Sequence, residues 1–217
     1  MKDMKIRRVF LSLLFAMGCF WTEASAQESG LEDLTFAQML KSVDLSKEQK
    51  AADLIKKFQD LEARQKLMNG PLSPKKGPCN IEAFRKKEVI LITIPASELF
   101  APNSADLSAG ASKYLTPIKR YMKDPDMFRV LLVMHTDNTG SSKYRDNITA
   151  DRVDAVTAWF EDQGADTSYT FSYAFGDESP LVPNTSYENR DKNRRLEVYL
   201  MPGTKMLEEA KKGKIDF

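Results

Sequence analysis

Two oppositely charged side chains, Asp137 and Arg152, stand out because of where the sequence places them. Asp137 lies among turn-forming residues just after the apolar run 130–134, which is typical of a buried strand. Arg152 follows Thr149, a predicted N-cap for a helix whose apolar positions continue to Phe160. An anion past a strand end and a cation in the first turn of a helix, fifteen residues apart, can face one crevice. Ligands favour that place in open α/β sheets, and by this analogy the crevice is the candidate binding site.

Few other residues could carry catalysis. His135 is the only histidine, and Cys79 is the only cysteine after residue 26. A hydrolase needs a nucleophile with a base, paired carboxylates in a cleft, or metal ligands. One histidine and one cysteine offer few ligands for a zinc ion. Because His135 ends an apolar strand, we interpret it as a structural residue. We therefore expect no enzyme, no metal and no cofactor, although the residue types alone leave open a pair of acidic residues of the glycosidase kind.

The second half of the chain contains a series of residues whose order and spacing match a known pattern. They are His135, Thr136, Asp137, Gly140, Ser141, Tyr144, Thr149, Arg152, Gly176, Glu178, Pro180, Asn184, Arg190, Asn193, Arg194 and Arg195. Their order and spacing resemble the OmpA C-terminal-like family of peptidoglycan-binding domains. That family's pattern runs roughly GHTD-x-x-G-S-x-x-YN-x-x-L-S-x-x-RA, then G-x-x-x-P, then N-x-T-x-x-GR-x-x-NRR. The resemblance covers about residues 88–201.

The resemblance implies a site for the zwitterionic end of diaminopimelate, which carries an ammonium and a carboxylate on one carbon. Asp137 is then expected to accept from the ammonium. Arg152 is expected to donate two parallel hydrogen bonds to the carboxylate, helped by free backbone N–H groups of a helix starting at Thr149. The resemblance also implies that Thr136, Asn103 and Arg194 are ligand-binding residues. On residue types alone, a plain ion pair between Asp137 and Arg152 is the simpler interpretation.

The chain departs from the family pattern at three positions. Met134 and Asn189 each replace a glycine, and Arg145 replaces the asparagine after the tyrosine. The last of these positions helps to line the family's pocket. Arg145 therefore leaves open whether peptidoglycan binding is preserved.

Residues 1–26 have the pattern of a secretory signal peptide. A basic start precedes the apolar run Val9–Trp21, and Ala24-Ser25-Ala26 forms a small-residue cleavage site. The apolar run is shorter than the roughly 20 residues that span a bilayer. A lipoprotein signal ending at Cys19 is the alternative. Either way, we expect a protein of the periplasm or of the periplasmic face of the outer membrane.

Residues 27–80 are expected to be a helical segment followed by a linker. Apolar residues form a stripe along the predicted helix 46–69, opposite a charged face. The stretch 71–80 is rich in proline and glycine, as linkers are. An isolated amphipathic helix needs an apolar surface to cover its stripe. That surface can be the protein's own domain, a second copy of the chain, or another envelope protein, and all three remain open.

Residues 81–203 are expected to fold as the OmpA-like domain, followed by a charged tail at 204–217. The predicted fold is α+β, a β-α-β-α-β-β sandwich with helices on one face of a mixed four-stranded sheet. An irregular loop is expected at about 176–192. The predicted strands are 88–95, 128–135, 169–175 and 194–201, and the predicted helices are 108–122 and 149–163. At Pro117 we expect either a kink in the first helix or a helix that restarts there.

Two classes of function follow from these features. The first is non-catalytic peptidoglycan binding that anchors the protein or the outer membrane to the cell wall. The second is an interaction or assembly subunit of an envelope complex, with the 35–69 helix as its protein contact. Nucleic acid is not an expected partner, because 32 basic and 31 acidic residues give a formal net charge of only +1.

Overall fold

The computed structural model describes residues 31–43 and 45–217. The predicted signal peptide and Cys19 lie outside the described residues. Within the described ranges, no helix is both long enough and apolar enough to cross a membrane.

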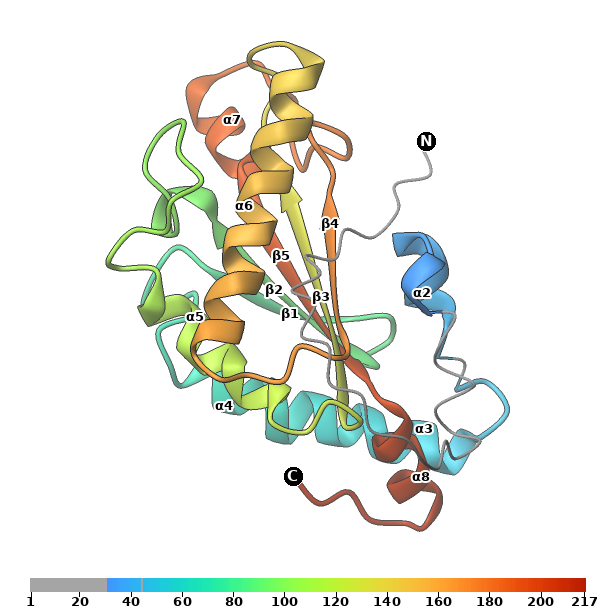
Figure 1. Ribbon diagram of the computed structural model, residues 1–217. Helices are drawn as coiled ribbons and strands as arrows, with labels where there is room; N and C mark the ends of the chain where they lie inside the picture. The colour runs from blue at the N-terminus through green and yellow to red at the C-terminus, as the bar shows by residue number, and fades with distance from the viewer. Residues whose placement is uncertain (1–30, 44) are drawn as a thin grey trace, which may run out of the picture.

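A five-stranded mixed sheet forms the centre of the fold (Figure 1). Its strand order is β1-β2-β5-β3-β4, and only β3 and β4 run parallel as neighbours. The α+β class and the mixed sheet are confirmed, whereas the predicted count of four strands was one too low. The strands are β1 (Asn80–Phe84), β2 (Val89–Pro95), β3 (Phe128–His135), β4 (Thr170–Ala174) and β5 (Arg195–Pro202).

The additional strand, β1, begins where a linker was expected to end. Ile81 is its only buried residue, and five residues are too few to show a clear strand pattern next to the expected linker. The turn to β2 runs through residues 85–87, which all have left-handed backbones with φ of 47°, 53° and 74°. It therefore lacks the Asn-Gly or Asp-Gly pair that usually marks a hairpin. Arg85 holds this turn in place by donating to the carbonyl oxygens of Leu40 and Val43.

Helical segments surround the sheet on more than one side (Figure 1). The two helices expected from the β-α-β pattern are α5 and α6, and Pro117 lies inside α5. The predicted charged tail contains α8. The helices are η1 (Leu31–Asp33), α2 (Phe36–Lys41), α3 (Gln49–Lys57), η2 (Phe58–Arg64), α4 (Gln65–Met68), η3 (Ala96–Glu98), α5 (Ser112–Lys119), η4 (Arg120–Met122), α6 (Ser142–Asp162), α7 (Tyr187–Asn193) and α8 (Thr204–Lys211).

The two faces of the sheet are covered by different parts of the chain. On one face, the hydroxyl of Thr157 in α6 lies 2.8 Å from that of Ser172 in β4. The next residue of β4, Tyr173, points to the opposite face because strand residues alternate. There Phe36 of α2 packs on Tyr173 and Tyr199, with ring centroids 5.5 and 5.2 Å apart. The N-terminal segment thus covers the face that α6 leaves open, and β3 and β5 are buried at every position.

The predicted 46–69 helix is a helical run of α3, the π-helical stretch η2, and α4. Its apolar stripe packs on the protein's own domain, since Ile55 is fully buried and Phe58 meets the ring of Phe128. The buried side chain of Gln59 donates to the carbonyl oxygens of Glu88 and Leu200, at 3.3 and 3.2 Å. These contacts join the run to the sheet and leave little of the stripe for a partner.

The packing of this helical run predicts its effect on stability. We expect Ile55→Ala to lower the free energy of unfolding by about 2–4 kcal/mol, because it opens a cavity at a fully buried site. Leu61→Ala is the matched control, since Leu61 is 46% exposed in the same run and should change stability by about 0.5 kcal/mol or less. Urea unfolding of both variants measures the difference, and equal values would contradict the described packing.

Candidate functional site

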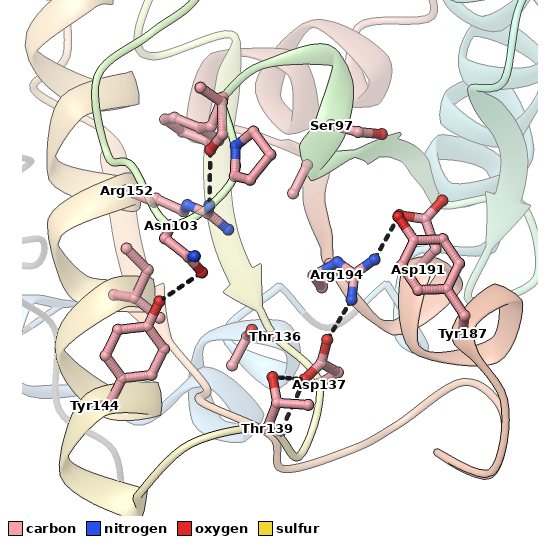
Figure 2. Close-up of a pocket in the computed structure, with 15 residues that line it drawn as sticks. Ser97, Asn103, Thr136, Asp137, Thr139, Tyr144, Arg152, Tyr187, Asp191 and Arg194 are labelled. Carbon is pink, nitrogen blue, oxygen red and sulfur yellow. Dashed lines mark hydrogen bonds and ion pairs between the residues drawn. The ribbon is translucent and has the colours of Figure 1, made fainter.

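A cavity of about 310 Å³ opens beside the C-terminal end of β3 (Figure 2). The loop after β2, the start of α6, and α7 with the residue after it form its walls. The structure brings all five predicted site residues, Asn103, Thr136, Asp137, Arg152 and Arg194, to this one cavity. The complete lining is Ala96, Ser97, Phe100, Ala101, Pro102, Asn103, Thr136, Asp137, Thr139, Tyr144, Ile148, Arg152, Tyr187, Asp191 and Arg194.

Asp137 lies almost fully buried two residues beyond the end of β3. Its Oδ1 accepts from the backbone N–H of Thr139 at 2.7 Å and from the Thr139 hydroxyl, and its Oδ2 accepts from Nη1 of Arg194. Burial by itself raises the pKa of Asp137, but the hydrogen bonds from Thr139 and the ion pair with Arg194 outweigh it, so the pKa is lowered. Asp137 is therefore an anion at neutral pH.

Arg152 is also buried, but its acceptors are neutral. Its Nε donates to the carbonyl oxygen of Ser104 at 2.8 Å, and Nη2 lies 3.5 Å from that of Ala101. The guanidinium stacks over Phe100, with its carbon 4.9 Å from the ring centroid. Among the described residues, no carboxylate lies within ion-pair distance of Arg152, and burial lowers its pKa. Asp137 and Arg152 thus do not form the simple ion pair that their residue types suggested.

The helix that carries Arg152 starts earlier than predicted. It begins at Ser142, and its N-cap is Ser141, whose side chain accepts from the N–H of Tyr144. Thr149 is inside the helix, where its hydroxyl donates to the Arg145 carbonyl oxygen at 2.9 Å and accepts from the Gly176 N–H. The prediction of a helix start at Thr149 was wrong because the first two turns are mostly exposed and polar, so the apolar periodicity begins late. No free helix-terminal N–H groups lie at Arg152.

Arg194 lies between two carboxylates that also line the cavity, those of Asp137 and Asp191. Its Nη1 donates to Asp137 and its Nη2 to Oδ1 of Asp191, the latter at 2.8 Å. Its guanidinium carbon lies 5.5 Å from the ring centroid of Tyr187. Burial by itself lowers the pKa of Arg194, but its hydrogen bonds to the two carboxylates raise it overall.

The wall that carries Arg194 depends on the fully buried Asn193. The Asn193 amide nitrogen donates to the carbonyl oxygen of Val182 and to Oδ1 of Asn184, both at 2.8 Å, and its oxygen accepts from the Val182 N–H at 3.1 Å. These bonds fold the preceding loop against the end of α7. They fix the direction from which Arg194 approaches Asp137.

The other two predicted residues lie on the remaining walls. Asn103 has a left-handed backbone with φ of 55°, and its Oδ1 accepts from the Tyr144 hydroxyl at 3.2 Å. Thr136 is held at the end of β3 by its N–H, which donates to the Gly176 carbonyl oxygen at 2.8 Å. Figure 2 shows Asn103 and Tyr144 on the side of the cavity opposite Arg194 and Tyr187.

Arg145, the departure from the family pattern, does not line the cavity. Its Nε donates to Asp177 at 2.7 Å, and its Nη1 donates to the Gly140 carbonyl oxygen. The Arg145 side chain therefore joins two loops outside the cavity.

Tyr187 and Asp191 are cavity residues that sequence reasoning missed, because α7 was predicted as irregular loop. A signal was present in Ser186, whose side chain accepts from the Asn189 N–H at 3.1 Å as an N-cap. Serine before a short polar segment is a helix start signal. The segment has no apolar periodicity, so that signal stood alone.

His135 belongs to a separate buried cluster behind the cavity. Its Nδ1 lies 3.3 Å from the Glu178 carbonyl oxygen, and its Nε2 lies 3.4 Å from Oε2 of Glu197. Glu197 also accepts from Nε of Arg195 at 2.7 Å and from the Tyr199 hydroxyl at 2.6 Å. These contacts agree with the interpretation of His135 as a structural residue.

This cluster predicts a loss of stability in acid. Burial by itself raises the pKa of Glu197, but His135, Arg195 and Tyr199 outweigh it and lower the pKa to about 2, from 4.5. The stabilisation is therefore fully present above about pH 4.5 and is lost as the pH falls towards 2. We expect the free energy of unfolding to fall by about 3 kcal/mol more over that interval in the parent than in Glu197→Gln. Urea unfolding at a series of pH values checks this, and parallel pH profiles would contradict it.

Comparison with known proteins agrees with the resemblance seen in the motifs. The model of the OmpA family matches residues 99–194. Probable lipoprotein YiaD of Escherichia coli (strain K12) is 26% identical over 122 residues, which cover 56% of this chain and 56% of that protein. The peptidoglycan-associated lipoprotein of Buchnera aphidicola subsp. Baizongia pistaciae (strain Bp) is 22% identical over 96 residues, 44% of this chain and 56% of that protein. The chain thus spans just over half the length of each of these relatives.

A solved structure extends the likeness beyond these residues. The crystal structure of a MotB-like protein from Desulfovibrio vulgaris superposes with a TM-score of 0.59 at 26% identity, covering 70% of this chain and 98% of that one. The fold is therefore shared over more of the chain than the family model matches. Residues 99–194, which hold all five predicted site residues, thus match the model of the OmpA family.

Proposed function

We propose that this protein binds peptidoglycan without catalysis and anchors itself, or the outer membrane, to the cell wall. The observation that carries the proposal is the buried guanidinium of Arg152, which has no carboxylate partner among the described residues and lines the same cavity as the anion Asp137. A buried charge without a partner is costly. A ligand that supplies a carboxylate removes that cost.

The hydrogen-bonding capacity left on Arg152 fits a carboxylate. Its Nε and one Nη2 proton are directed at backbone carbonyl oxygens, and Nη1 has no acceptor among the described residues. The guanidinium can therefore donate from Nη1 and Nη2 to both oxygens of one carboxylate. Lysine offers a point charge without this planar, two-pronged geometry.

The capacity left on Asp137 fits an ammonium. A carboxylate offers about four lone-pair sites, and three are occupied by the two donors of Thr139 and by Arg194. A ligand ammonium can use the remaining site, where the charge of Asp137 favours it. A ligand that places an ammonium and a carboxylate on one carbon thus satisfies both residues.

The free end of diaminopimelate in the peptidoglycan stem peptide has this chemistry. The OmpA-family domain and a relative named as a peptidoglycan-associated lipoprotein support this choice of ligand. Two relatives named as lipoproteins, YiaD and the peptidoglycan-associated lipoprotein, support a location in the periplasm or on the periplasmic face of the outer membrane. Binding without catalysis accords with Cys79, which is buried and whose pKa is raised by that burial to about 12, well above that of a nucleophilic thiol.

The second candidate is an assembly subunit that binds a protein through the 35–69 segment. Ile55 and Phe58 of that segment pack inside the protein, so a partner would find mainly Leu61. We therefore rank peptidoglycan binding above it.

Binding to purified sacculi tests the proposal. Asp137→Ala and Arg152→Ala should each weaken binding by about 30-fold or more, since removing one side of a desolvated charge contact costs about 2–5 kcal/mol. Arg152→Lys should recover only part of the affinity because it loses the paired geometry. Co-sedimentation over a range of protein concentrations measures these effects, and thermal melts verify that each variant folds.

Two controls make this experiment specific. Arg145→Ala removes an arginine outside the cavity and should bind like the parent protein. Sacculi with lysine in place of diaminopimelate should bind at least about tenfold more weakly, because the lysine side chain ends in an ammonium with no adjacent carboxylate for Arg152. If folded Asp137→Ala and Arg152→Ala variants sediment like the parent, the proposed site is incorrect.

A further inference from the structure

Exposed aromatic side chains gather at the mouth of the cavity. Among the described residues, Tyr144 and Tyr187 are the only tyrosines that are more than a third exposed, at 40% and 68%, and both line this cavity. Figure 2 shows them on opposite sides, with Thr136 and Asp137 between them. Tyr144 is tied to Asn103 through its hydroxyl. The Tyr187 hydroxyl has no hydrogen bond to another described residue, and its ring packs on Arg194.

We infer that Tyr187 is a specificity-determining residue that packs against the stem peptide next to its diaminopimelate, so that the site recognises a peptide rather than a free amino acid. The inference rests on the proposed function and adds a second point of contact to it. An aromatic ring that is largely exposed at a cavity mouth offers apolar area that a ligand can cover, at little cost in side-chain entropy.

The position of Tyr187 selects the part of the ligand that it meets. Its ring centroid lies 5.5 Å from the guanidinium carbon of Arg194, and Arg194 in turn donates to Asp137. Figure 2 shows the Tyr187 ring beyond the Arg194 guanidinium, on the side away from Asp137. In diaminopimelate, three methylenes separate the free zwitterionic carbon from the peptide-bonded carbon, a span of about 5 Å. A ligand whose ammonium lies at Asp137 and whose chain runs past Arg194 would therefore bring the first peptide group of the stem towards the ring.

The sugar of peptidoglycan lies farther along the same chain. Two more stem residues separate it from diaminopimelate, and each advances an extended chain by about 3.3–3.6 Å. The stem peptide therefore lies closer to Tyr187 than the sugar does. Contact of Tyr187 with the sugar is the alternative that the experiment can detect.

The wall on which Tyr187 stands is fixed before ligand arrives. Arg194 is held by Asp137 and Asp191 from two sides, and Asn193 fastens the end of α7 to the preceding loop. Replacing the Tyr187 ring therefore removes apolar contact area but leaves both ion pairs of Arg194. This separation allows the contribution of the ring to be measured apart from that of the charges.

Three probes test the inference by titration calorimetry with the full protein: free diaminopimelate, the stem tripeptide that ends in diaminopimelate, and the same tripeptide on its disaccharide. Free diaminopimelate and the tripeptide present the same ammonium-and-carboxylate end. We expect Tyr187→Ala to weaken tripeptide binding by about five- to tenfold and free diaminopimelate binding by less than about twofold. Tyr187→Phe should bind all three probes like the parent. Leu181→Ala is the matched control, because Leu181 is 56% exposed in the preceding loop and does not line the cavity.

Each other outcome has a distinct meaning. Unchanged tripeptide binding by Tyr187→Ala overturns the inference, and so does a loss confined to the disaccharide probe, which would assign Tyr187 to the sugar. Equal losses on free diaminopimelate and tripeptide also overturn it, because they would make Tyr187 a support for Arg194. If the parent protein binds none of the three probes, the proposed function fails and the inference fails with it.

Discussion

The ion pair between Asp137 and Arg194 is the contact on which the cavity depends. It joins the end of β3 to the residue just before β5, and it is set by the register of those strands. Antiparallel pairing places His135 opposite Arg195, so Thr136 and Asp137 come directly beside Arg194. Each charge would be costly to bury alone, and the pair is completed by Thr139 on one side and Asp191 on the other. Because both strands are fully buried, this register cannot slip without turning their apolar residues away from the core.

At this end of the sheet, adjacent residues lie either at the cavity or in the buried cluster behind it, because side chains alternate between the two faces of a strand. Arg194 points to the cavity, whereas Arg195 pairs with Glu197 in the buried cluster behind it. Likewise, Thr136 lines the cavity and His135 faces Glu197. The cluster of His135, Arg195, Glu197 and Tyr199 thus supports the sheet end from behind. The two adjacent arginines are therefore not interchangeable, although they have the same charge.

Of the charged residues that line the cavity, Asp137, Asp191 and Arg194 are paired with one another, whereas Arg152 has no carboxylate partner among the described residues. Asp137 accepts from protein donors, whereas the partners of Arg152 among the described residues are two backbone carbonyl oxygens and the ring of Phe100. In the proposed complex, the anionic part of the ligand would therefore gain most from Arg152, while the cationic part would join an existing network at Asp137. A site of this kind is pre-organised, since its charged groups are held in position by backbone bonds before any ligand arrives.

The sequence by itself determined the central strands, the α+β class and the identity of the charged residues at one sheet end. Those features were visible because β2, β3 and β5 contain apolar or alternating runs, and because the spacing of Asp137, Arg152 and Arg194 resembles a known motif. Tertiary structure decided the rest. β1 and α7 have little apolar periodicity, so their form depends on contacts such as those of Arg85 with Leu40 and of Asn193 with Val182. The early start of α6 at Ser142 was hidden because its exposed first turns carry no apolar pattern. The partner of Asp137 was likewise not readable from spacing, since strand pairing brings Arg194 to it from 57 residues away while Arg152 turns to backbone carbonyl oxygens.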